Sequence, residues 1–141
     1  KFLEADTVVH VPNTNYFYRR DISSGVSAIN FHDNNRIDDI FAVADELGDE
    51  LKRVGKYDEF ESQIRTLQIA ICLQRVDEVK QWDASEERKS EVKNYIFSTM
   101  YEKYGSMEGT DDMALQCKAG FKVVDEYKEF IEKDATKGAR K

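Results

Sequence analysis

The stretch TLQIAICLQRV, residues 66–76, is the strongest indication of the fold because its apolar side chains widen into an unbroken run at residues 69–73. It lies in a longer segment, 57–81, in which apolar residues recur every three or four positions, as on the buried face of an α-helix. We predict a helix over this segment, most deeply buried at 69–73. Cys72 is interpreted as a small core side chain. Trp82 is expected to fill a gap between helices, whereas an exposed Trp82 would indicate a site for stacking on a sugar or a partner.

A second helical pattern precedes this segment. Its apolar residues are Ile37, Ile40, Phe41, Ala44, Leu47, Leu51 and Val54. Gly55 follows the pattern as an expected helix end, and the short connection to Lys56 predicts that the two helices are antiparallel. The opposite face is rich in aspartate and glutamate, and we interpret it as solvated.

Further helices are predicted after Trp82. Ser85 begins one that ends at Gly105, with an apolar face formed by Val92, Tyr95, Ile96, Thr99 and Met100. Another begins at residues 110–112 and is interrupted at Gly120, giving one kinked helix or two short ones. The prediction for residues 33–132 is a bundle of four to five helices, followed by a flexible basic tail at 133–141.

The beginning of the chain has a different character. Residues 7–19, TVVHVPNTNYFYR, are rich in β-branched and aromatic side chains around Pro12, which predicts a pair of short strands. Two strands are not stable alone, so we expect the pair to complete the sheet of an upstream domain. The first residue is Lys1 rather than methionine, which leads us to expect a cut at this point, by cloning or by proteolysis. The fold class is therefore mainly α, with a strand pair before the bundle.

Composition excludes several classes of protein. The 141 residues carry a formal net charge of −7, which disfavours nucleic-acid partners. No stretch approaches the roughly 20 apolar residues of a membrane span. Cys72 and Cys117 lack the spacing of a zinc site or a disulfide framework, and a reducing cytoplasm is the expected location. His10 and His32 have no triad-like neighbours, and no phosphate-binding glycine loop or D-x-D pair is present, so no catalytic residue or metal ligand is assigned.

One segment has the chemistry of a ligand site. Aromatic and guanidinium side chains lead there into a loop of small residues, and the candidates are Tyr16, Tyr18, Arg19, Arg20, Ser24 and Ser27. Guanidinium groups suit a diphosphate or carboxylate, and a Ser/Gly loop brings backbone N–H groups close to phosphate. The alternative is a strand end whose aromatics pack on a sheet while the arginines pair with acidic helices.

The run VVHVPNTNYFYRRDISSGVS resembles the end of the catalytic domain in family 2 glycosyltransferases of the bacterial polysaccharide type. Tyr16, Tyr18 and Arg19 match the Tyr-x-Tyr-Arg motif of that family by position, and the remaining candidates fall in the loop that comes after it. The resemblance covers about residues 1–27 and implies that residues 1–32 end a GT-A-type domain, with 33–132 as a helical C-terminal domain.

The resemblance also implies an activity for the complete enzyme. A sugar would pass from a nucleotide-sugar donor to a glycan acceptor, with Mg²⁺ or Mn²⁺ on the donor diphosphate. The catalytic motifs would precede Lys1, so the fragment alone is expected to be inactive, without a cofactor of its own. Its partner would be the upstream catalytic domain, and the enzyme would be cytoplasmic, at the inner membrane face as a peripheral protein.

Two other interpretations stay open. The chain could be an independent helical protein-interaction module without enzymatic activity, or a homodimer that buries the surface its catalytic domain would cover. A buried Trp82 together with an unpartnered strand pair favours the transferase. A self-sufficient hairpin packed on the bundle favours the interaction module.

Overall fold

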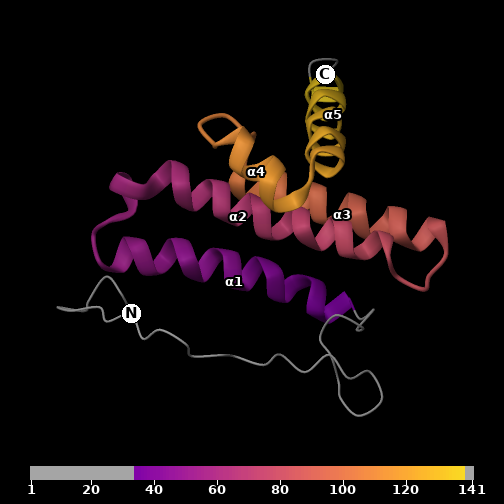
Figure 1. Ribbon diagram of the computed structural model, residues 1–141, viewed down its shortest axis with the longest axis horizontal. Helices are drawn as coiled ribbons and strands as arrows, with labels where there is room; N and C mark the ends of the chain where they lie inside the picture. Colours follow the sequence, from indigo (N-terminus) through magenta and orange to yellow (C-terminus); the bar gives the residue numbers. More distant parts are fainter. Residues whose placement is uncertain (1–33, 139–141) are drawn as a thin grey trace, which may run out of the picture. The chain divides into compact units, whose positions relative to one another are not determined.

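A computed structural model describes residues 34–138 of the chain, which contain five helices and no strand (Figure 1). The helices are α1 (Asn34–Arg53), α2 (Tyr57–Lys80), α3 (Glu86–Tyr104), α4 (Asp112–Ala119) and α5 (Phe121–Gly138). The mainly helical fold is thus confirmed for this part of the chain. The strand pair predicted at 7–19 lies outside the described residues. None of the described helices is long and apolar enough to cross a membrane.

Helix α2 is the centre of the bundle and contacts each of the other four helices. Figure 1 shows α1 and α2 side by side and antiparallel, as the short connection at Gly55 predicts, and α3 packs against α2 as well. Helices α4 and α5 also pack against α2, and α5 lies across the axes of α1, α2 and α3 (Figure 1).

Local signals set most of the helix ends. Ser85 caps α3 by accepting a hydrogen bond from the backbone N–H of Arg88 at 3.2 Å. The side chain of Asp111 caps α4 in the same way, through the N–H of Ala114 at 3.0 Å. Gly120 has a φ of +88°, which a residue with a Cβ adopts only under strain, so the pattern beyond residue 110 forms two helices rather than one kinked helix. Helix α5 continues to Gly138, into the segment 133–141 that the sequence predicts to be a flexible basic tail.

The core lies where residues 69–73 predict it. Ile69, Cys72 and Leu73 are fully buried, whereas Ile71 is only half-buried. Residues of all five helices contribute to the cluster around them. Trp82 is 5% exposed and packs beneath the guanidinium of Arg75, which lies 5.7 Å from the ring centroid, so its predicted role as a filler between helices is confirmed.

The predicted apolar face of α3 needs a correction. Tyr95 was expected on that face but is 46% exposed, whereas Phe97 was not predicted there and is 2% exposed. The reason is that α5 packs against α3 and buries Phe97, whose ring lies 5.2 Å from that of Tyr127 and 5.5 Å from that of Phe130. A prediction from a single helical period misses the contact with α5, because it assumes that α3 is covered on one side only.

Candidate functional site

The site predicted from sequence lies outside the described residues. Its members are Tyr16, Tyr18, Arg19, Arg20, Ser24 and Ser27. The described residues instead contain a hollow between the first turns of α1 and the first half of α3, with a volume of about 370 Å³. We call it the Tyr95 hollow. It is lined by Ile37, Asp38, Arg88, Glu91, Val92 and Tyr95.

Helical geometry brings these side chains together. On α3, positions 88, 91, 92 and 95 are three or four residues apart, so they share one face of the helix. On α1, Ile37 and Asp38 lie close to the helix start, and Ile37 is anchored in the core with 1% exposure. The hollow therefore has a floor of Ile37 and Val92 and a polar rim.

Two hydrogen bonds connect side chains of the rim. The hydroxyl of Tyr95 donates to Oδ1 of Asp38 at 2.5 Å, linking α3 to α1. This bond to the carboxylate raises the pKa of Tyr95, since the carboxylate favours the protonated phenol. Arg88 donates from Nη1 to Oε2 of Glu91 at 3.0 Å. The ring of Tyr95 stands edge-on to Phe41, with centroids 6.5 Å apart and an interplanar angle of 82°, and this contact with α1 helps to orient the ring.

This arrangement suits the binding of a neutral, polyhydroxylated ligand. The half-exposed ring of Tyr95 offers an apolar surface for C–H groups, while the Asp38 and Glu91 carboxylates accept hydrogen bonds from hydroxyl groups. The guanidinium of Arg88 donates from the same rim. Such a combination of one aromatic surface with a few placed polar groups is typical of small-molecule sites.

Sequence reasoning missed this hollow because it placed Tyr95 in the core. The sequence did contain a signal: the spacing of Arg88, Glu91 and Tyr95 puts all three on one face of α3, so that face carries charged side chains beside the ring. The role of Asp38 could not be read from α1 alone, since its partner lies 57 positions further along the chain.

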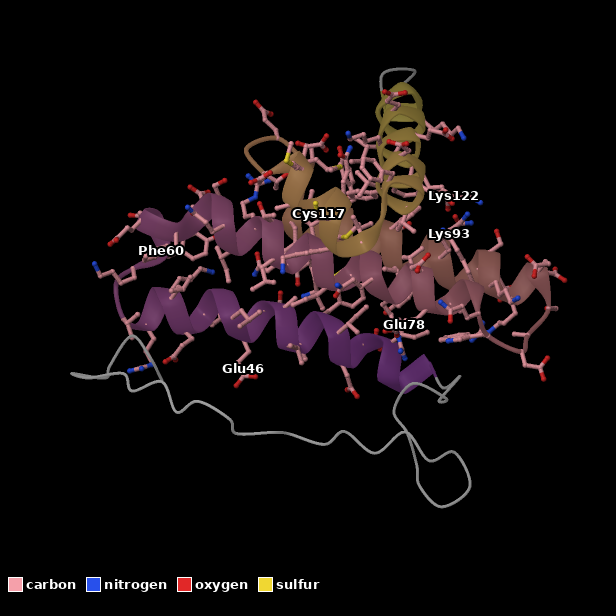
Figure 2. All side chains as sticks on the ribbon, in the orientation of Figure 1. Glu46, Phe60, Glu78, Lys93, Cys117 and Lys122 are labelled. Atoms are coloured by element: carbon pink, nitrogen blue, oxygen red, sulfur yellow. The ribbon has the colours of Figure 1, made fainter. Side chains whose placement is uncertain are left out.

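The acidic face of α1 is only partly solvated, which corrects the prediction made for it. Glu46 is exposed and points away from α2 (Figure 2). Asp45, however, accepts hydrogen bonds from Nζ of Lys103 at 2.7 Å and from the hydroxyl of Tyr104 at 2.8 Å. Burial alone would raise the pKa of Asp45, but these two bonds and the Lys103 charge lower it below its ordinary value. This carboxylate therefore joins α1 to α3.

The described residues offer no donor set for the divalent ion that the family resemblance implies. Within residues 34–138, no group of three or more His, Cys, Asp or Glu side chains could hold a metal ion.

Neither a protein-family model, nor a curated protein, nor a solved structure matches this chain.

Proposed function

We propose that the chain is the C-terminal part of a cytoplasmic family 2 glycosyltransferase, and that its helical domain holds the glycan acceptor at the Tyr95 hollow. The catalytic groups and the divalent ion would belong to the preceding domain. The helical domain would contribute binding rather than bond making or breaking.

The observation that carries this proposal is the Tyr95 hollow, a fixed aromatic ring with carboxylate and guanidinium groups around it. The chain reaches the hollow directly from the segment that resembles a transferase, because Ile37 and Asp38 come soon after residues 1–32 in sequence. Of the residues around the hollow, Ile37 and Asp38 are therefore the ones that follow Tyr16, Tyr18 and Arg19 most closely in the chain.

Binding by the hollow can be measured on the chain itself. Saturation-transfer NMR with a panel of neutral oligosaccharides is expected to give signals that saturate with concentration and disappear in Tyr95→Ala. Phe121→Ala is the matched control, since Phe121 is also an exposed aromatic residue but lies on α5. Equal loss in both variants, or no saturable signal from any oligosaccharide, would overturn the acceptor role.

The transferase assignment needs a separate experiment on the enzyme that contains this chain. Replacing Arg19 and Arg20 together by alanine is expected to lower kcat/KM for the nucleotide-sugar donor by roughly 10- to 100-fold, the loss typical of charged hydrogen bonds. Lys56→Ala, at an exposed position on the turn before α2, is the control. Unchanged activity in the double variant would contradict the proposed role of the arginines.

A second candidate is a helical protein-interaction module, favoured by the exposure of Met113 (74%) and Phe121 (68%). Self-association through these residues would make the sedimentation coefficient rise with concentration, and Phe121→Glu would abolish the rise. A monomer at all concentrations would exclude the homodimer.

A further inference from the structure

A second hollow lies on the other side of α3 and is rich in lysine. It is formed by α2, α3 and α5, and its volume is about 330 Å³, within the roughly 300–1,000 Å³ of ligand pockets. We call it the lysine groove. The charged residues that line it are Lys80, Lys89, Lys93, Lys122, Glu86 and Glu126.

The lysine groove and the Tyr95 hollow use opposite faces of α3. The groove takes positions 86, 89, 90 and 93, and the hollow takes 88, 91, 92 and 95. The two sets have the same spacing but are displaced by two residues, which is about 200° around an α-helix. The two sites are therefore separate, and binding at the lysine groove is independent of the proposed function.

The charge of the groove is opposite to that of the whole chain. Four lysines face two glutamates, a local excess of positive charge in a chain with a formal net charge of −7. Val76 and Val79 form an apolar wall, which excludes water from one side and weakens screening of the ammonium groups.

The groove already holds one oxyanion of the protein itself. The carboxylate of Glu126 lies between two ammonium groups, with Oε1 at 3.2 Å from Nζ of Lys80 and Oε2 at 3.2 Å from Nζ of Lys93. Burial acts to raise the pKa of Glu126, but the bonds from both lysines lower it, so the carboxylate stays charged. Glu126 neutralises only part of the positive charge of the four lysines.

The remaining lysines are available to a ligand. Lys89 pairs with Glu86 at 3.0 Å, but the side chain of Glu86 is 89% exposed, so water competes for this pair. Lys122 forms no ion pair with any residue of the described range 34–138. Figure 2 shows Lys93 on α3 and Lys122 on α5 at the same side of the molecule.

We propose that the lysine groove binds the phosphoryl group of a small molecule, with Lys89 and Lys122 as its principal contacts and Lys80 and Lys93 as shared ones. Phosphate oxygens can accept several charged hydrogen bonds at once. A hollow bounded by three helices fits a compact phosphate or diphosphate better than an extended membrane surface, which would need a flat basic face.

The test is NMR titration of the chain with inorganic pyrophosphate and, separately, inorganic phosphate. We expect saturable shifts of groove residues, with tighter binding of pyrophosphate if the natural ligand carries a diphosphate and equal binding if it carries a single phosphate. Lys89→Gln combined with Lys122→Gln should weaken binding by roughly 10-fold or more. Lys118→Gln combined with Lys133→Gln, which removes the same charge at exposed sites outside the groove, should leave it unchanged.

A third variant gives the opposite prediction. Glu126→Gln releases Lys80 and Lys93, so affinity for pyrophosphate should rise, by roughly 10-fold. A groove that is only a structural ion-pair network would give no saturable binding in any variant. That result would overturn the proposal, as would equal weakening in the groove and control variants, or binding to anionic phospholipid vesicles without binding to pyrophosphate.

Discussion

The contact between α1 and α2 at Gly48 allows a sharp test of the packing. Gly48 is buried inside α1, where alanine would normally stabilise a helix by about 1 kcal/mol. An added Cβ, however, would lie only 2.9 Å from Nε2 of Gln68. Gln68 is itself 6% exposed, and its Nε2 donates to the carbonyl oxygen of Ala44 at 2.9 Å.

The sizes of two opposing free-energy terms decide whether Gly48→Ala stabilises or destabilises the chain. Displacing the Gln68 amide leaves buried polar groups unsatisfied at a cost of about 1–3 kcal/mol. This cost equals or exceeds the helix-propensity gain, so Gly48→Ala should change the free energy of unfolding by between about zero and 2 kcal/mol in the destabilising direction. In a Gln68→Ala background the obstruction is gone, and the same substitution should stabilise by about 1 kcal/mol.

The assay is urea unfolding followed by circular dichroism for the four proteins of the double-mutant cycle. The coupling energy is expected to be about 1–3 kcal/mol, with unchanged m-values. Asn94→Ala, at an exposed position of α3, provides a control for helix propensity alone. Equal stabilisation by Gly48→Ala in both backgrounds would refute this account of the contact, because Gln68 would then not be held there.

Two further predictions concern titratable groups. The pKa of Asp45 is lower in the folded chain than its ordinary value of 3.8, so its contribution to stability is present above that value and is lost as pH falls through the folded pKa. Between about pH 5 and about pH 2, the midpoint of thermal unfolding should therefore depend less on pH in Asp45→Asn than in the parent chain. Asp49→Asn is the control, because the carboxylate of Asp49 is exposed, and it should keep the pH dependence of the parent chain. Identical pH profiles for the two variants would contradict this role of Asp45. Burial raises the pKa of Cys72 to about 12, whereas Cys117 is exposed, so a water-soluble thiol reagent should label Cys117 at once and Cys72 only as the chain unfolds. Labelling kinetics of Cys117→Ser check this, and a fast phase in that variant would be incompatible with a buried thiol.

The two hollows lie on different faces of α3 and differ in chemistry. We expect the face with the Tyr95 ring to bind hydroxyl groups and the face with Lys89 and Lys93 to bind oxyanions. Tyr95→Ala and the paired substitution at Lys89 and Lys122 should therefore act independently, since residues without shared partners contribute additively.

The helices and many of their ends could be predicted from the amino-acid sequence. The caps at Ser85 and Asp111, the break at Gly120 and the buried run at 69–73 act through neighbours a few residues away, so a local pattern reveals them. The sequence also suggested a transferase segment at 1–27, which stays a prediction.

The covered faces of α3 and the positions of the hollows became visible only in the folded chain. The bond from Tyr95 to Asp38 and the position of Glu126 between Lys80 and Lys93 join residues of different helices. A helical period gives the angle of each side chain about its own axis, but not how many neighbours that helix has. The Tyr95 hollow forms where α1 meets α3, and the lysine groove forms where α5 packs near α3, so both result from packing between helices that are not consecutive in the chain.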